Sequence, residues 1–467
     1  MSSDQPTLAI GEFAAGLTYK TLPEPVRLHL ADLLLDYFRV ASTGERMEWS
    51  RWINAYTNIA GGKGDASILF SPDKTDPARA ALVNATYSGS IDADDVHVGS
   101  MLHPGCVVFS AALAAGQHFK LSGHDVLAAV AAGYEAMIRI ALAMQPSHFR
   151  RGFQSTATCG GFGAATAVAS LFFKGTDGPR RVAESIGLVA SMAGGVTQFY
   201  QSGSTVKRIH AAWACHSGVM AALMARHGFS GPTDILEGEN GFTRAYADES
   251  DLSKITDGLG SEFKLLEVTV KGHASSARVM AAVEGMAALC SENNAGHTDI
   301  EKIRIGIPSV IKGRLTINEP VDIQAAQMSL PFSMAIAAKR APDAGANLAL
   351  SVGDYVENID DADVRDLAMR IDCEVDTSMD EQAAGDSVPA DITITLKDGS
   401  EHSTYVSAPK GSPSRPFTRD DHVVRFNDEL QKRYSKEKTA AILEQLEHFD
   451  ELMDISTLSK LLNDSLD

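Results

Sequence analysis

The sequence predicts a mainly α protein, in which an all-α domain built from both ends of the chain carries an inserted α+β domain. Apolar residues recur at helical spacing through the first part of the chain, two segments alternate polar and apolar residues after about residue 265, and helical spacing returns from Arg419. The length of 467 residues also favours two domains over one. We expect 1–265 and 406–467 to form the all-α domain and 266–405 to form the α+β domain.

Helices in the first part are predicted from their start and stop residues. Pro25 can stand at a helix start, and the apolar spacing after it continues to Gly44. Asp76-Pro77 is typical of an N-cap followed by a first-position proline, and Ser122-x-x-Asp125 is a variant of the capping box. Further helical runs, each followed by a glycine or a polar stop, cover 126–144, 156–174, 180–192 and 210–227.

The second part shows strand patterns as well as helices. Residues 301–307 alternate polar and apolar side chains, and so do 391–396. The latter run is followed by Lys397-Asp398-Gly399 and then 402–406, which predicts a β-hairpin with an Asp-Gly turn. Helices are predicted over about 276–291, 322–340 and 361–369, and no convincing strand pattern precedes residue 265.

Charge and cysteine content argue against several classes of partner and location. Lys and Arg number 41 and Asp and Glu number 60, so the formal net charge is −19, which disfavours nucleic acids and anionic membrane surfaces as partners. Five widely spaced cysteines without a C-x-x-C pair favour the reducing cytoplasm. Because the N-terminus has no basic leader and no run approaches about 18 apolar residues, we expect neither secretion nor a membrane span.

Reactive side chains gather in residues 92–104, with the sequence DADDVHVGSMLHP. Three carboxylates and two imidazoles can form an acid–base site, in which the carboxylates orient the histidines and tune their pKa values. Asp and His are also metal ligands, and an ordinary acidic turn before a helix has the same composition. The segment alone leaves these three interpretations open.

Two further segments carry cations beside glycines. Residues 201–210, QSGSTVKRIH, place Lys207, Arg208 and His210 at a helix start, which suits a carboxylate or phosphate as well as it suits a plain surface loop. Lys271-Gly272-His273 lies where the helical part gives way to the mixed part, and ligand sites favour domain boundaries. Since no strand precedes the glycines at 160–163, no nucleotide-binding loop is predicted.

Together these segments resemble the MmgE/PrpD family, which includes 2-methylcitrate dehydratase, cis-aconitate decarboxylase and iminodisuccinate epimerase. The resemblance extends over roughly residues 5–450. It rests on DADDVHVGSMLHPG at 92–105, RGFQSTATCGGFGAA at 151–165, STVKRIHAAWACHSG at 204–218, GFSGPTDILEGENGF at 228–242 and AQMSLPF at 326–332.

The resemblance implies an all-α helical domain with an inserted α+β lid domain, a homodimer, a small polycarboxylate substrate, and neither cofactor nor metal. It implies that the active site contains Asp92, His103, Lys207 and Lys271. Further substrate contacts are expected from neighbouring motif positions: His97, Gln154, Arg208, His273 and Phe332.

Three positions depart from the family pattern. Gln154 stands where the family usually has His, Val96 where it often has Thr, and Phe332 where several members have Tyr. Each change removes a titratable or hydroxyl group, which disfavours dehydration and decarboxylation, because both need a well-placed acid for a leaving group or a product carbanion.

We therefore expect an epimerase that acts without a cofactor on an iminodisuccinate-like polycarboxylate, by removing the α-proton and adding it back. Lys207 and His103, the latter oriented by Asp92, are the expected bases on the two faces of the carbon. A lyase, such as a 2-methylcitrate-type dehydratase or a cis-aconitate decarboxylase, is the alternative. A catalytically inactive relative that binds a polycarboxylate is another.

Overall fold

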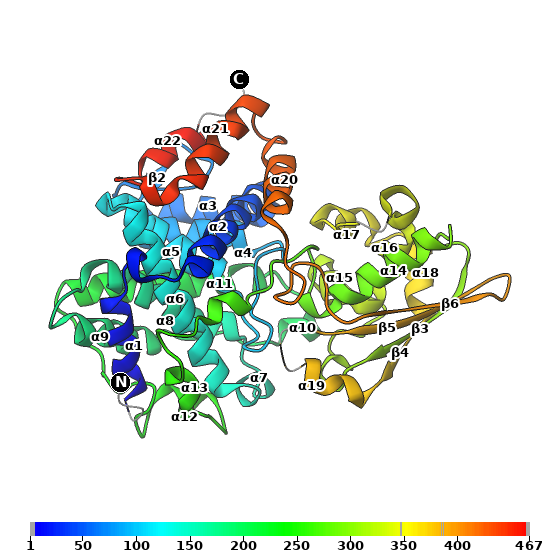
Figure 1. Ribbon diagram of the computed structural model, residues 1–467, viewed down its shortest axis with the longest axis horizontal. Coiled ribbons are helices and arrows are strands. Elements are labelled where there is room, and N and C mark those ends of the chain that lie inside the picture. Colours follow the sequence, from blue (N-terminus) through cyan, green and yellow to red (C-terminus); the bar gives the residue numbers. More distant parts are fainter. Residues whose placement is uncertain (1–4, 346–347, 384, 386, 464–467) are drawn as a thin grey trace. The chain divides into compact units, whose positions relative to one another are not determined.

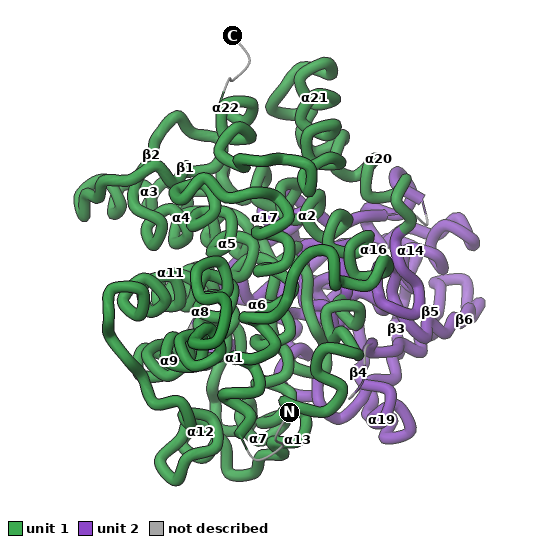
Figure 2. Tube along the Cα trace, turned by 60° about the vertical axis from the view of Figure 1, so that its left-hand side comes forward, with its two compact units in different colours: residues 1–197, 206–268, 418–467 green, residues 198–205, 269–417 purple. Residues whose placement is uncertain are grey.

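In the computed structural model, which describes residues 5–345, 348–383, 385 and 387–463, the chain forms two units (Figures 1 and 2). Unit 1 takes residues 1–197, 206–268 and 418–467, and unit 2 takes 198–205 and 269–417. The sequence-based borders at 265/266 and 405/406 thus move to 268/269 and 417/418. The segment after the last strand stays with unit 2, where Gly411 accepts a backbone hydrogen bond from Val270 at 2.9 Å.

Unit 1 is helical apart from two very short strands, so the mainly α fold class is confirmed. Its helices are α1 Pro6–Gly16, α2 Glu24–Glu45, α3 Glu48–Ala60, α4 Pro77–Gly89, α5 Gly105–Phe119, α6 Gly123–Met144, α7 Ser147–Arg150, α8 Ser155–Phe172, α9 Gly178–Ala190, α11 Lys207–Arg226, α12 Phe242–Tyr246, α13 Ser253–Thr256, α20 Arg419–Leu430, α21 Lys436–Glu447 and α22 Thr457–Asn463. Strands β1 (Ala66–Ser67) and β2 (Lys74–Thr75) pair antiparallel. The sequence predicts no strand here, because two residues are too few to show alternation.

The predicted caps begin the helices as expected. The Asp76 carboxylate accepts from the amides of Ala78 and Arg79, each at 3.1 Å, at the start of α4. Ser122 accepts from the Asp125 amide at 3.2 Å and starts α6. α11 differs from its prediction, because it begins at Lys207 instead of residue 210. Lys207 therefore lies in the first turn of a helix, and not in the loop before it.

α6 is the buried centre of unit 1. It is long and apolar enough to cross a membrane by length and composition, but 94% of its most apolar 18-residue window is buried inside the fold, as in the core helix of a soluble protein. The ion pair between Arg139 and Glu135 lies within this core, and both side chains have 0% exposure. Arg139 Nε donates to Glu135 at 2.8 Å, while its Nη atoms donate to the backbone oxygens of Asp257 and Glu262.

Small residues let α6 and α8 approach closely. A Cβ atom added at Gly133 on α6 would lie 2.7 Å from the backbone oxygen of Gly163 on α8 and 2.6 Å from a methyl group of Val108. Backbone atoms cannot move aside as a flexible side-chain end can, so even one methyl group at this position forces the two helices apart.

We expect Gly133→Ala to lower the free energy of unfolding by about 1–3 kcal/mol, the usual cost of overpacking a core. The midpoint of urea unfolding, followed by circular dichroism, measures this change. Gly16→Ala is the matched control, because a Cβ at Gly16 meets no atom within 4 Å. Equal midpoints for the two variants would contradict the close approach of α6 and α8.

Unit 2 is a four-stranded sheet with helices. Its strands are β3 Ile300–Ile307, β4 Ile371–Val375, β5 Ala390–Leu396 and β6 Glu401–Val406, and its helices are α10 Phe199–Ser202, α14 Met280–Glu292, α15 Ile323–Met328, α16 Leu330–Ala344, α17 Val352–Asn358, α18 Ala362–Met369 and α19 Asp380–Ala383. The order is β4-β3-β5-β6, with β3 parallel to β4 and antiparallel to β5. The predicted hairpin is β5–β6.

Alternation places one face of this sheet in the hydrophobic core of unit 2. Ile303 and Ile305 on β3 and Ile392 on β5 are fully buried there with residues of α14 and α16. The single helix predicted over 322–340 is two helices. Ser329 caps the second one by accepting from the Phe332 amide at 3.0 Å, and Pro331 stands in its first turn.

Candidate active site

The loop between α4 and α5 holds the predicted acid–base segment. Asp92, 3% exposed, has a positive φ of 61°, a conformation that non-glycine residues rarely adopt and that Asp tolerates better than most. Its carboxylate forms an ion pair with Lys207 in the first turn of α11. Two residues that are 115 positions apart thus meet, as the resemblance implies.

His103 ends the same loop and is held by its Nδ1 atom. That nitrogen lies 3.0 Å from the backbone oxygen of Asp95 and 3.3 Å from the carboxylate of Asp94. A carbonyl oxygen only accepts hydrogen bonds, so Nδ1 carries a proton and Nε2 is the atom left for exchanging protons. The prediction that Asp92 orients His103 needs correction, because Asp94 is the carboxylate at the imidazole while Asp92 pairs with Lys207.

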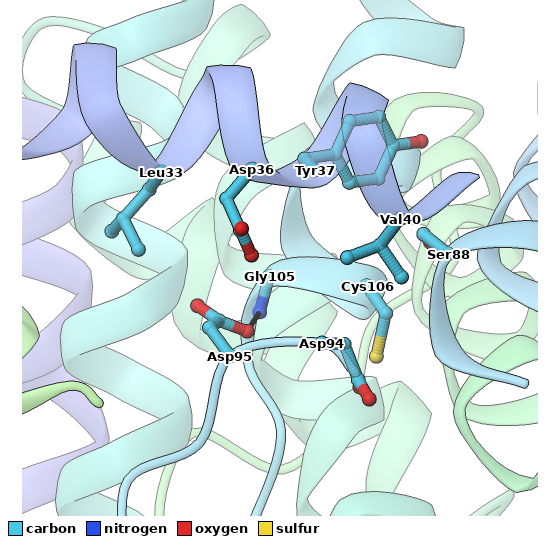
Figure 3. A pocket seen from close by; sticks show the side chains of 9 residues that line it. All are labelled: Leu33, Asp36, Tyr37, Val40, Ser88, Asp94, Asp95, Gly105 and Cys106. Carbon is cyan, nitrogen blue, oxygen red and sulfur yellow. Dashed lines mark hydrogen bonds between the residues drawn. The ribbon is translucent and has the colours of Figure 1, made fainter. Parts of the chain in front are cut away.

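Asp95 fastens this loop to the start of α5. Its carboxylate accepts from the Gly105 amide and from the Tyr134 hydroxyl, both at 2.8 Å. Burial raises the pKa of Asp95 to about 7, although the Tyr134 hydrogen bond opposes the rise. Figure 3 shows the bond to Gly105, and it shows the carboxylates of Asp94 and Asp95 pointing in different directions around a small cavity. Asp94 lines both this cavity and the larger pocket described next.

A pocket in unit 1 brings four of the predicted residues together. It is formed by the loop before α5 and by residues of α4, α8 and α11. Its lining comprises Gly89, Asp92, Asp94, His103, Gln154, Thr156, Lys207, His210 and Ala211. Asp92, His103, Gln154 and Lys207 are thus predicted site residues that share one pocket.

Lys207 and His210 differ in charge although both line this pocket. Burial, with a smaller contribution from the neighbouring Lys207, lowers the pKa of His210 to about 4, so this imidazole is neutral at pH 7. Asp94, Thr156 and His210 are lining residues that the predicted site set omits. All three stand in segments that resemble the family, so position within a motif was the signal that could have found them.

Two predicted substrate contacts lie outside the lining of this pocket. The Arg208 guanidinium donates to the backbone oxygen of Ser90. Its Cζ atom lies over the Trp49 ring, 4.4 Å from the ring centroid. His97 Nε2 lies 3.3 Å from the carboxylate of Glu267, and this hydrogen bond is the largest cause that lowers the pKa of Glu267 to about 2. The roles of Arg208 and His97 in substrate binding stay predictions.

Three of the predicted site residues belong to unit 2. Lys271 is buried with 1% exposure, and His273 Nδ1 accepts from the Leu350 amide at 3.1 Å. Phe332 is part of the hydrophobic core of unit 2. The roles of these three residues stay predictions. Within the described ranges, no group of three or more His, Cys, Asp or Glu side chains is arranged to hold a metal ion.

Comparison with known proteins assigns the chain to a family. Residues 8–255 match the model of the MmgE/PrpD N-terminal domain, and residues 273–450 match that of the MmgE/PrpD C-terminal domain. The chain belongs to the MmgE/PrpD family. This confirms the resemblance found in the sequence.

Relatives within the MmgE/PrpD family carry lyase names. A cis-aconitate decarboxylase of Aspergillus terreus is 24% identical over 98% of this chain and 96% of its own length. The cis-aconitate decarboxylase of Homo sapiens is 25% identical over 96% of this chain and 92% of its own length. A cis-aconitate decarboxylase-like protein of Aspergillus oryzae, oryM, is 28% identical over 54% of this chain. These names favour the lyase alternative over the epimerase.

Proposed function

We propose that this MmgE/PrpD protein is a carboxy-lyase that removes CO2 from a small unsaturated tricarboxylate such as cis-aconitate. The observation that carries the proposal is the pocket in which Lys207 lies with His103, whose Nδ1 is held by the Asp95 carbonyl. The full-length similarity to cis-aconitate decarboxylases supports the same reaction class. Lys207 is the lysine in the lining that can contact an anionic substrate, although it is also paired with Asp92.

The reaction needs one protonation and a place for negative charge. When the methylene carboxylate leaves as CO2, its C–C bond breaks, and the electron pair shifts across the C=C bond to the carbon next to another carboxylate. Lys207 stabilises the resulting enediolate, and protonated His103 then delivers a proton to that carbon. His103 recovers its proton from water, so one proton is consumed and one CO2 is formed.

Gln154 is one of the positions from which the sequence disfavours decarboxylation as well as dehydration. The loss of a histidine at position 154 removes one titratable group, but His103 and Lys207 remain in the pocket. A decarboxylation that needs a single proton donor can proceed with His103 alone, whereas a dehydration needs a further acid for its leaving hydroxide.

Incubation of the purified protein with cis-aconitate in D2O tests the proposal. We expect release of CO2 and a dicarboxylate with a terminal C=CH2 group, which carries one deuterium next to a carboxylate in its NMR spectrum. No release of CO2 from cis-aconitate at high protein concentration would contradict the proposed reaction.

An epimerase acting on iminodisuccinate is the second candidate. One observation favours it: His103 and Lys207 come from different elements and reach one pocket, while Gln154 offers no proton. In the same D2O experiment, an epimerase would exchange the α-hydrogen of an iminodisuccinate stereoisomer without releasing CO2. A protein that only binds polycarboxylates would show neither change.

We also propose a cytoplasmic homodimer that joins through unit 1, but not through α6, whose apolar surface is buried in the core. The exposed apolar side chains of α3 and α11 are better candidates for the interface. Trp52 and Tyr56 on α3 are 51% and 55% exposed, and Trp213 on α11 is 51% exposed. The Arg208–Trp49 contact joins the first turns of these two helices, and exposed apolar surface of this kind is typical of interaction sites.

Sedimentation at micromolar concentration should give twice the mass of one chain. Trp213→Glu should shift the protein toward the monomer, because a charge in an apolar interface loses its water without gaining a partner. Phe229→Glu, at another exposed aromatic residue, is the control. A monomer for the unaltered protein would exclude the dimer, and a dimer in Trp213→Glu would exclude this interface.

A further inference from the structure

Gln154, immediately before α8, uses only one end of its amide within the protein. Its side-chain carbonyl accepts from the Ala157 amide at 2.6 Å and so caps the helix. Because a backbone N–H only donates, the atom at this contact is Oε1, which fixes the orientation of the whole amide group. The NH2 group of Gln154 therefore points away from the capping contact.

Gln154 is nearly buried, with 7% exposure, and belongs to the pocket lining together with Lys207 and His103. Among the described residues, Nε2 of Gln154 has no acceptor. The atom is also not fully buried, so it keeps some access to open space. A nearly buried amide that retains access to open space and lacks a protein partner there is available to a ligand.

The start of α8 adds two backbone donors next to Gln154 in the chain. The amides of Ser155 and Thr156, the first two of this 18-residue helix, have no acceptor in the described part of the chain. Thr156 itself lines the pocket. A helix N-terminus carries partial positive charge, and unpaired amides there bind anions.

We propose that Gln154 and the N-terminus of α8 form the subsite for a substrate carboxylate that is retained in the reaction. The proposal rests on the proposed function only in taking the substrate to be a polycarboxylate. Donors without a competing acceptor suit the two oxygens of a carboxylate. Gln154 thus determines specificity through a hydrogen bond, and the proton of the reaction comes from another residue.

Gln154→Glu tests the subsite with little structural change. Glutamate keeps an oxygen for the Ala157 amide, and its negative charge is favourable at a helix N-terminus, so the melting temperature should stay equal or rise. It replaces the donor by an anion that repels a carboxylate. The Kd for propane-1,2,3-tricarboxylate, a saturated tricarboxylate without the C=C bond, should rise by at least roughly tenfold in calorimetry.

Two further variants make the test specific. Gln431→Glu adds the same charge at an exposed position of unit 1 outside the pocket lining and should leave this Kd unchanged. Gln154→Met removes the donor without adding charge and should weaken binding several-fold. In turnover assays, Gln154→Glu should raise KM by a larger factor than it lowers kcat.

The outcomes separate the subsite from the reaction. Tricarboxylate binding at wild-type strength in both Gln154 variants would overturn the subsite, and so would an unaltered protein that does not bind this probe. If Gln154→Glu abolishes binding while the unaltered protein releases no CO2 from cis-aconitate, the subsite stands and the proposed decarboxylation is wrong.

Discussion

Lys207→Ala and His103→Ala should each lower kcat/KM by roughly 10²–10⁴-fold, the usual loss when a proton-transferring or charge-stabilising group is removed. Both side chains line the pocket, and each has a distinct task in the proposed reaction. Without Lys207 the enediolate loses its cation, and without His103 it loses its proton donor. The rates of CO2 release at saturating and at limiting substrate concentrations give kcat and kcat/KM for each variant.

Controls separate this chemistry from folding. His448→Ala and Lys436→Ala delete the same side-chain types at exposed positions outside the pocket and should keep full activity. Lys207→Ala deprives the buried Asp92 of its ion-pair partner, so Asp92→Asn in the same chain removes the charge left behind. That double variant should regain stability but not activity. Full turnover by Lys207→Ala would show that the lysine does not take part.

Arg139→Leu should lower the free energy of unfolding by about 3–5 kcal/mol, because it leaves the carboxylate of Glu135 buried without its partner. Glu135 has 0% exposure and, apart from Arg139, accepts from the Leu265 amide at 2.9 Å. Burial already raises the pKa of Glu135, an effect that Arg139 opposes. The urea midpoint of the variant, compared with that of the unaltered protein, measures the loss.

A second substitution distinguishes the lost pair from the lost volume. Glu135→Leu combined with Arg139→Leu removes both buried charges and should recover part of the stability. Lys302→Leu, which breaks an exposed ion pair with Asp372, should unfold at the same urea concentration as the unaltered protein. If Arg139→Leu also unfolded at that concentration, the pair would not stabilise the core.

The fold was most predictable where one residue specifies a boundary. Asp76 and Ser122 mark helix starts that the structure reproduces, since capping is a local interaction within four residues. β4 was missed because only Ile371 among its five residues is buried, which leaves little apolar signal. Its parallel pairing with β3 joins segments that lie far apart in the chain, and local patterns contain no information on such pairing.

The candidate site shows the same division between local and distant information. Family motifs placed Asp92, His103, Gln154 and Lys207, and these residues do line one pocket. The motifs do not reveal that Asp92 has a positive φ and pairs with Lys207 while Asp94 lies at His103. Lys207 and Arg208 are neighbours in sequence, but successive helical residues point about 100° apart, so once α11 begins at Lys207 the two diverge.

The contact between the two ends of unit 1 has a consequence for synthesis on the ribosome. Arg419 in α20 pairs with Asp32 in α2 at 2.8 Å, across 387 residues of chain, and Arg433 and Glu45 form a similar pair. At about 5–20 residues per second, α2 emerges roughly 20–80 s before α20 can cover it. During that interval the nascent chain exposes a helix face without its partner. Chaperone demand should therefore be greatest in that interval, and truncations that remove α20 should aggregate during expression.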